Sequence, residues 1–300
     1  MPRHAKDEWD IASSVGLTAL GVAGGRAIES KRSDALVVDP YAEALVTSVD
    51  AGVPMPTRLP HPGYENDEQF EQMWSRTATH MGLRSRFFDK FFARGWRAGV
   101  TQAVILASGL DARPWRLDWP QECAVFEIDQ PQVLEFKDQV VAREDVKPSC
   151  THRTVAIDLR EDWPAALQEA GFDRSRPTAW LAEGLLMYLP EEAEAQLLSA
   201  VHELSAPGSR IALEHARSLQ EQVNSNDWHE RMTKQFGIDI AELFYDNAGR
   251  PDPDERLAEM GWQADVTTGE DLAAAHGRTD EGMPTDVTRQ QRYITAQLPS

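Results

Sequence analysis

The chain has 300 residues, 41% of them hydrophobic, which is enough to fill one large core or two smaller ones. Its formal charge of -19 would repel a phosphate backbone, so DNA and RNA are not expected as partners. A transmembrane helix needs roughly 18 consecutive apolar residues, and none occur here; residues 1–8 also lack the apolar stretch of a signal peptide.

The cysteine and histidine content argues against disulfides and metals. Cys123 and Cys150 are too few for a disulfide framework, which favours a reducing cytoplasm. The eight histidines are scattered, without the HxxxH or CxxC spacing that a metal site needs. We therefore expect a cytoplasmic protein without a bound metal.

Helical patterns dominate the first hundred residues. Residues 9–30 are rich in Ala, Gly and Ser, which predicts a helix packed closely against a neighbour. Asp39 is a plausible N-cap, with Pro40 at the first position of a second helix. The proline-rich segment 50–63 predicts an exposed loop or a mobile flap. Residues 65–98 carry apolar residues every three or four positions, which predicts one or two helices whose stripe is more often core than binding site.

From residue 101 onward, short apolar runs alternate with helical stretches. This alternation predicts a parallel sheet with helices on both faces, and the final run lacks a crossover, so it can enter the sheet antiparallel. The predicted strands are 103–107, 124–129, 153–158, 178–183, 210–215, 263–267 and 292–297. The predicted helices are 132–143, 163–170, 191–205 and 254–260.

Residues 217–252 interrupt this rhythm with a polar segment that carries aromatic residues at roughly helical intervals. An insertion after a late strand lies at the sheet end where ligands bind, so a lid over a substrate is one interpretation. An ordinary extra pair of helices fits the periodicity equally well.

The turn Ala107-Ser108-Gly109 follows the first predicted strand and is built of small residues. Small residues let a ligand approach the backbone, as in nucleotide-binding turns, but the dinucleotide fingerprint has three glycines and this turn has only Gly109. The turn alone therefore leaves two interpretations open, a nucleotide site and an ordinary connection between strand and helix.

Acidic residues end the next three predicted strands. Asp129 lies at the spacing of the carboxylate that binds ribose hydroxyls, although it can instead cap the following helix. Asp158 and the backbone of Leu159 suit an adenine amine and ring nitrogen, or Asp158 caps the helix at Trp163. Glu183, followed by Gly184, points to the same crevice. GxSxG, HExxH and P-loop motifs are absent, which disfavours hydrolase and phosphoryl-transfer chemistry.

These motifs together resemble a known family. The leucine carboxyl methyltransferase-like family of S-adenosyl-L-methionine-dependent methyltransferases is similar in ILASGLDARPWRL, VFEIDQPQVLEFK, AIDLR and LAEGLLMYL, and its bacterial members also in DEWDIASSVGLTALGVAGGRAI and DPYAEALV. The resemblance implies a Rossmann-like class I methyltransferase fold: an α/β protein whose seven-stranded, mostly parallel sheet has an antiparallel last strand. It further implies a helical N-terminal cap. We therefore expect the cap to span residues 1–98 and the cofactor domain residues 99–300, in which the insertion 217–252 would be the lid.

The resemblance also assigns roles in binding S-adenosyl-L-methionine. The methionine part lies on the turn Ala107, Ser108 and Gly109, where Ala107 replaces the first glycine of the family's GxG. The ribose binds the acid matched by Asp129, the adenine binds Asp158 and Leu159, and Glu183 lies near the amino group. An upstream arginine pairs with the methionine carboxylate; we expect Arg84, with Arg86 as its rival.

The implied reaction is in-line transfer of a methyl group to a small-molecule acceptor, with oxygen as the expected acceptor atom. A carboxylate acceptor needs no general base, whereas an alcohol or phenol needs one, for which His215, Tyr188 and His80 are candidates. An NAD-dependent oxidoreductase and a non-catalytic protein that binds S-adenosyl-L-methionine remain as alternatives. The oligomeric state cannot be derived from the sequence.

Overall fold

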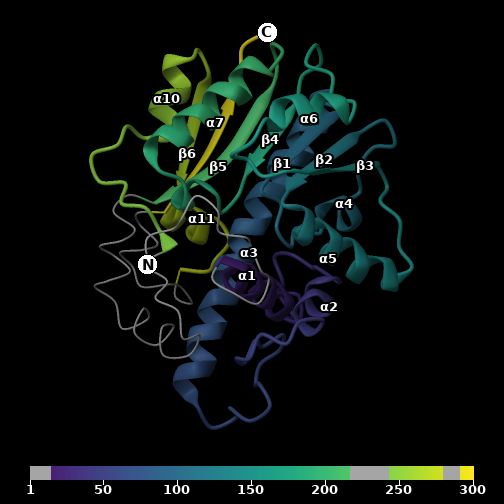
Figure 1. Ribbon diagram of the computed structural model, residues 1–300. Coiled ribbons are helices and arrows are strands. Elements are labelled where there is room, and N and C mark those ends of the chain that lie inside the picture. Colours follow the sequence, from purple (N-terminus) through teal and green to yellow (C-terminus); the bar gives the residue numbers. More distant parts are fainter. Residues whose placement is uncertain (1–14, 217–242, 280–290) are drawn as a thin grey trace.

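A computed structural model describes residues 15–216, 243–279 and 291–300 and shows a seven-stranded sheet with helices on both faces (Figure 1). The strands are β1 (Gln102–Leu106), β2 (Ala124–Asp129), β3 (Thr151–Ala156), β4 (Ala179–Ala182), β5 (Arg210–Ala216), β6 (Gln263–Thr268) and β7 (Gln291–Gln297). The helices are α1 (Val15–Glu29), α2 (Ala42–Thr47), α3 (Glu68–Arg97), α4 (Arg113–Arg116), α5 (Pro131–Val141), η1 (Ala142–Glu144), α6 (Trp163–Glu169), η2 (Leu186–Tyr188), α7 (Glu191–Glu203), α10 (Pro253–Glu259) and α11 (Gly269–Ala275).

The strand order β3-β2-β1-β4-β5-β7-β6 confirms the predicted α/β fold. Strands β1 to β5 pair in parallel, whereas β7 runs antiparallel between β5 and β6, as expected for the last strand. The order reverses at β1, from which β2 and β3 lie to one side and β4 and β5 to the other. Ligands of such sheets bind outside the carboxyl ends of the strands at that point of reversal, so the segments after β1, β2, β3 and β4 are where a site is expected.

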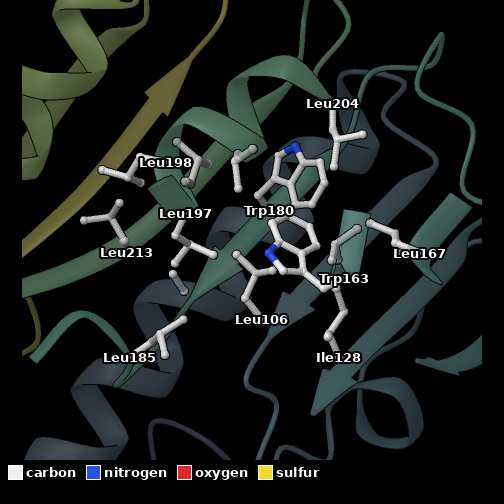
Figure 2. Packing of buried hydrophobic residues seen from close by; sticks show 14 of the residues in the cluster. Leu106, Ile128, Trp163, Leu167, Trp180, Leu185, Leu197, Leu198, Leu204 and Leu213 are labelled. Atoms are coloured by element: carbon white, nitrogen blue, oxygen red, sulfur yellow. The ribbon is translucent and has the colours of Figure 1, made fainter. Parts of the chain in front are cut away.

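Alternate residues of the central strands supply two separate cores. In β1, Val104 and Leu106 point into one hydrophobic cluster while Ala103 and Ile105 point into the other, as the two-residue pleat requires. Figure 2 shows the first cluster, where Trp180 of β4 packs against side chains of α6 and α7. The opposite cluster is covered by α3 and α11. Every residue of β1 is buried, so the strand is packed on both faces. The turn that follows β1 therefore starts from a fixed position.

Among the N-terminal helices, α1 packs along α3 (Figure 1). The close approach depends on glycine: a Cβ at Gly25 would lie 2.7 Å from Met81 Cγ, and one at Gly24 would lie 2.8 Å from Pro56 O. The small-residue helix predicted over residues 9–30 is therefore correct in its packing, although residues 9–14 lie outside the described part of the chain.

Three predictions for residues 39–98 are corrected or made more specific by the structure. Asp39 does not cap a helix: α2 begins at Ala42 after Tyr41, and the Asp39 carboxylate accepts hydrogen bonds from Arg26 Nε at 2.8 Å and from Tyr41 N at 3.1 Å. The segment 50–63 has no regular structure but is only partly exposed. Within residues 65–98 there is one helix, α3 (Glu68–Arg97), capped by Asp67.

Of the predicted lid, residues 217–242 lie outside the described ranges, so the lid interpretation stays a prediction. Residues 243–252 lead into α10, which Asp252 and Glu255 cap reciprocally, and Tyr245 N donates to Met187 O at 3.0 Å. The short helices α4 and α11 were not predicted. None of the helices in the described ranges combines the length and apolar character that a membrane crossing requires.

Candidate functional site

The turn after β1 has an unusual backbone. Ala107 and Gly109 both have positive φ angles, 50° and 49°, and Ser108 between them is buried and donates its N–H to Ile128 O at 3.1 Å. A Cβ added at Gly109 would meet no atom within 4 Å, so there is open space beside the turn at this point. Alanine adopts the left-handed conformation at a cost of roughly 1–2 kcal/mol, which the surrounding structure must offset.

Asp129 ties the end of β2 to this turn. Its Oδ2 accepts the Gly109 N–H at 2.6 Å and its Oδ1 accepts the Gln130 N–H at 2.7 Å. The N-cap of α5 is Gln130, so the helix-cap interpretation of Asp129 is wrong. Burial raises the pKa of Asp129, and the two amide donors only partly oppose the rise. A carboxylate has about four acceptor sites, so these two bonds leave capacity for ligand hydroxyls.

Asp158, beyond the end of β3, is brought near Asp129 through Gln130, whose Nε2 donates to Asp158 Oδ2 at 3.1 Å. Asp158 also accepts from Arg160 N at 2.8 Å and Arg160 Nη2 at 2.6 Å, and these hydrogen bonds lower its pKa. Asp162, not Asp158, caps α6, so the second cap interpretation is also wrong. The side chain of Leu159 packs against the hydrophobic cluster shown in Figure 2. The contact with adenine that the sequence predicts for Leu159 would therefore come from its backbone.

Arg84 of α3 and Glu183 after β4 meet on the other side of the turn. Arg84 Nη2 donates to Glu214 Oε1 at 2.5 Å, and its Nε lies 3.2 Å from Glu183 Oε1. Glu214 Oε1 also accepts the Gly184 N–H at 2.6 Å. Burial alone would lower the pKa of Arg84, but Glu214 and Glu183 raise it above its ordinary value. Its rival Arg86 is exposed on the same helix and lies outside this cluster.

Sequence reasoning missed the arginines of α4 as members of the site. Arg113 bonds Glu183 Oε2 at 2.6 Å, Asp89 Oδ1 at 2.8 Å, and Asp111. Arg116 bonds Asp89 through Nη1 and Nη2, each at 2.7 Å. The sequence signal that could have indicated these arginines is the run DARPWR, which follows the turn directly. Their partner Asp89, however, lies on α3, 24 residues before Arg113 in the sequence. Only the folded chain brings the two together.

The three candidate bases lie in separate surroundings. His215 at the end of β5 has its Nε2 3.4 Å from Asp252 Oδ1. Tyr188 of η2 has its hydroxyl 3.2 Å from Thr18 Oγ1 of α1. His80 is half-buried on α3, one turn before Arg84, and burial followed by the Arg84 charge lowers its pKa to about 3. An imidazole with that pKa is neutral at physiological pH and is a weak base, because it takes up a proton only in strong acid.

The residues at the strand ends fit S-adenosyl-L-methionine. Asp129 has free acceptor capacity for ribose hydroxyls, and the space beside Gly109 admits a ligand against the backbone. Arg84 Nε is buried without an aligned hydrogen bond, despite its proximity to Glu183, so a donor remains for a carboxylate. Within residues 15–216, 243–279 and 291–300, no three His, Cys, Asp or Glu side chains gather as ligands for a metal.

Comparison with known proteins gives a consistent result. The family described as "Leucine carboxyl methyltransferase" matches residues 19–202, more than half of the chain. A protein of Saccharopolyspora erythraea named "Putative S-adenosyl-L-methionine-dependent methyltransferase" is 47% identical over 98% of this chain and 99% of its own. A Mycobacteroides abscessus protein of the same name is 46% identical over 99% of this chain and 97% of its own.

Solved structures resemble the fold. A duf574 family protein of Streptomyces avermitilis superposes with a TM-score of 0.56 over 94% of this chain and 97% of its own. A structure from Thermobifida fusca titled "putative methyltransferase" reaches a TM-score of 0.50 over 93% of this chain and 94% of its own. Both are 15% identical to this chain, so they support the α/β architecture and nothing finer.

Proposed function

This chain belongs to the leucine carboxyl methyltransferase family and is an S-adenosyl-L-methionine-dependent methyltransferase, and we propose that its acceptor is an oxygen atom of a small molecule, either a carboxylate or a hydroxyl. Membership in this family disfavours the NAD-dependent oxidoreductase and the non-catalytic binding protein. We further propose that residues 1–98 act as a cap, residues 99–300 as the cofactor domain and residues 217–252 as a lid.

The observation that carries the proposed cofactor site is the bond between Asp129 Oδ2 and the Gly109 N–H, 2.6 Å long. It joins the residue proposed for the ribose to the turn proposed for the methionine part, so that both contact points move as one unit. Asp158 and Leu159 extend this unit to the adenine, through the bond from Gln130 to Asp158. Such preorganisation lowers the entropy that binding costs.

The charged cluster beyond the turn is proposed to hold the amino acid end of the cofactor. Arg84 would pair with the carboxylate, for which its Nε has no aligned partner, and Glu183 would accept the ammonium group. Glu214 and Arg113 keep these two side chains oriented, because each bonds one of them at 2.6 Å or less. Arg84 must share its guanidinium between Glu214 and the ligand, which its several donors allow.

When bound, S-adenosyl-L-methionine supplies a methyl group that its sulfonium already activates. The work left to the protein is therefore to hold the acceptor oxygen in line, roughly 3 Å from that methyl group, and to exclude water. A carboxylate acceptor requires no proton removal. A hydroxyl acceptor requires a base, and His80, one turn from Arg84, would be a weak one, because its pKa of about 3 lies far below the operating pH. This favours a carboxylate acceptor.

The acceptor is proposed to approach from the cap side of η2. There the Tyr188 hydroxyl meets Thr18 of α1 at 3.2 Å, and the Tyr188 ring lies 5.4 Å from that of Phe244. An aromatic wall with hydroxyl groups at its edge suits a small organic acceptor. The description of the matching family names a carboxyl group as acceptor, which supports oxygen as the atom methylated.

The compartment proposed is the cytoplasm. Cys123 and Cys150 are both free in the structure, and burial raises the pKa of their thiols to about 11 and about 12, so both resist oxidation. Free thiols of this kind are compatible with a reducing compartment such as the cytoplasm.

The test is a transfer assay with S-adenosyl-L-methionine labelled in its methyl group. Panels of small carboxylic acids, phenols and alcohols are offered, and S-adenosylhomocysteine is quantified. Labelled product that releases methanol in mild base is an ester, and base-stable product with an O-methyl carbon resonance is an ether. A product methylated on nitrogen, carbon or sulfur would contradict the proposed acceptor atom while leaving the activity in place.

A further inference from the structure

A fully buried ion pair lies directly behind the cofactor turn. Lys137 of α5 and Glu127 of β2 both have side chains with 0% exposure, and Nζ lies 2.7 Å from Oε1. The second oxygen of Glu127, Oε2, is 2.7 Å from His152 Nε2 of β3. Both carboxylate oxygens of Glu127 thus have a partner, one on helix α5 and one on the neighbouring strand β3.

Lys137 also reaches the turn itself. Its Nζ donates to Ser108 Oγ at 3.0 Å, across the space between α5 and the end of β1. Ser108 is the residue between the two positive-φ positions, Ala107 and Gly109. A turn with two left-handed residues depends on outside contacts to stay in that conformation. Ser108 is held by the side-chain contact from Lys137, by the bond from its N–H to Ile128 O of β2, and by the bond that its carbonyl accepts from Asp111 N.

Stability alone does not account for this pair. Moving each ion from water into the interior costs several kcal/mol, and a buried pair is on average no more stabilising than well-packed apolar residues of the same size. A buried lysine that contacts a turn hydroxyl nevertheless does what an apolar residue cannot. It donates a charge-assisted hydrogen bond, which is shorter and stronger than a neutral one and fixes direction.

We propose that the Glu127–Lys137 pair positions the turn Ala107–Gly109 for S-adenosyl-L-methionine by holding Ser108 Oγ, with Glu127 and His152 orienting the lysine. Lys137 and Glu127 are positioning residues that act through Ser108. This inference rests on the proposed placement of the cofactor on the turn.

The lysine charge also acts on the acids of the site. Burial raises the pKa of Asp129, and Lys137 is among the groups that oppose the rise. For Asp111, burial is likewise the largest influence, but Arg113 and other cations including Lys137 lower the pKa overall. The ammonium is therefore close enough to keep the carboxylate proposed for the ribose more ionised than burial alone would allow.

The experiment is a double-mutant cycle read out by calorimetric titration with S-adenosylhomocysteine. The variants are Ser108→Ala, the charge-free double variant Glu127→Gln/Lys137→Met, and the triple variant that combines them. The double variant avoids leaving one buried ion unpaired, which would confuse folding with binding. Coupled residues give a non-additive cycle, whereas independent residues add.

We expect the double variant to bind about tenfold more weakly than the wild type, a loss of about 1.4 kcal/mol, because the turn loses its hydrogen bond from the lysine. We expect Ser108→Ala to weaken binding similarly, and the triple variant to bind no worse than Ser108→Ala. In turnover assays with any identified acceptor, KM for S-adenosyl-L-methionine should rise while kcat changes little.

Gln102→Leu is the matched control. Gln102 is buried at the opposite end of β1 and hydrogen-bonds Thr178 Oγ1 at 2.8 Å and Asp173 O at 3.0 Å. Its replacement lowers the free energy of unfolding through the same strand without touching the turn. It should leave the dissociation constant of S-adenosylhomocysteine unchanged. A loss of affinity in this control equal to that in the double variant would overturn the inference, because general destabilisation would then explain both.

The remaining outcomes separate the two proposals. A wild type that binds S-adenosylhomocysteine, with an unchanged dissociation constant in the double variant or a triple variant that adds both losses, overturns the positioning role alone. A wild type that does not bind overturns the proposed cofactor site and this inference with it. If the double variant fails to fold, Ser108→Ala still tests the positioning role. Lys137 is proposed to act through the Ser108 hydroxyl, so unchanged affinity in Ser108→Ala would overturn that role.

Discussion

Asp129 and Asp89, on the two sides of the site, have pKa values displaced in opposite directions. Burial raises the pKa of Asp129, whose protein partners are the neutral N–H groups of Gly109 and Gln130. Burial also acts on Asp89, but the guanidinium groups of Arg116 and Arg113 lower its pKa overall. Asp129 therefore has neutral amides as its direct partners, with Lys137 acting only as a nearby charge, and keeps acceptor capacity for a ligand, whereas Asp89 pairs directly with two arginines and belongs to the scaffold.

The difference divides the site into a binding side and a supporting side. On the binding side, replacing a carboxylate should reduce ligand affinity with little loss of stability. On the supporting side, replacing a charged group should leave several buried partners without a counter-charge and lower the free energy of unfolding.

Arg113→Met should give the largest effect. Arg113 contacts Asp89, Asp111 and Glu183, and its loss leaves three carboxylates in the interior without this cation. Breaking a buried pair in this way costs about 3–5 kcal/mol, which urea unfolding would measure. The control is Arg160→Met, since Arg160 is 54% exposed and pairs with Asp158 at the surface. It should cost less than about 1 kcal/mol, and losses of equal size would remove the distinction between the two sides.

The pH dependence of stability should have opposite signs for the two aspartates. Asp89, with a lowered pKa, stabilises the fold above its unfolded pKa near 3.8, and this contribution is lost as pH falls through its folded pKa. Asp129, with a raised pKa, favours the fold below its unfolded pKa, and this contribution is lost as pH rises through its folded pKa. A tenfold difference in proton affinity between the folded and unfolded states corresponds to about 1.4 kcal/mol of stability.

Carboxyl carbon NMR titration of the folded protein measures both pKa values directly. The midpoint of Asp129 should lie above 3.8 and that of Asp89 below it. In Asp89→Asn, the free energy of unfolding should fall less steeply as the pH is lowered, because the carboxyl group that titrates in the wild type is absent. Two midpoints displaced in the same direction would contradict the division of the site.

Ala107→Gly should give the smallest effect. The substitution relieves a left-handed alanine at φ 50°, but glycine also gains entropy in the unfolded chain, so the net gain in stability is at most about 1 kcal/mol. Affinity for S-adenosylhomocysteine should stay equal or improve. Asp145→Gly is the matched control, since Asp145 also has φ 50° but lies in the connection after α5, and it should affect stability alone. A clear loss of affinity in Ala107→Gly would show that the alanine methyl contributes to binding.

Much of the fold could be predicted because the alternation of apolar and polar residues that marks each strand or helix lies within a short stretch of sequence. Strand β1 is apolar on both faces and β2 ends in a carboxylate, so the alternation of strands and helices indicated the sheet and its carboxyl edge. The acids at strand ends were visible for the same reason, since topology sends them to one edge whatever their partners are.

What could not be predicted depends on pairs distant in sequence. Asp39 has the sequence position of an N-cap, but Arg26 takes its carboxylate in the folded chain. Lys137 has the sequence position of an ordinary residue of a helix, yet it is buried between Glu127 and Ser108. Helical periodicity tells which face a residue occupies and not which charge it will meet there, so the ion pairs around the turn required the structure.

The most direct test of the cofactor site is calorimetric titration of S-adenosylhomocysteine into the wild type, Asp129→Ala and a control variant, Asp162→Ala. Asp162 caps α6 away from the turn, and its loss costs about 1 kcal/mol of stability without removing a proposed ligand contact. We predict that the wild type and Asp162→Ala bind alike and that Asp129→Ala loses measurable binding while remaining folded. Undiminished binding by Asp129→Ala would contradict the placement of the cofactor at the end of β2.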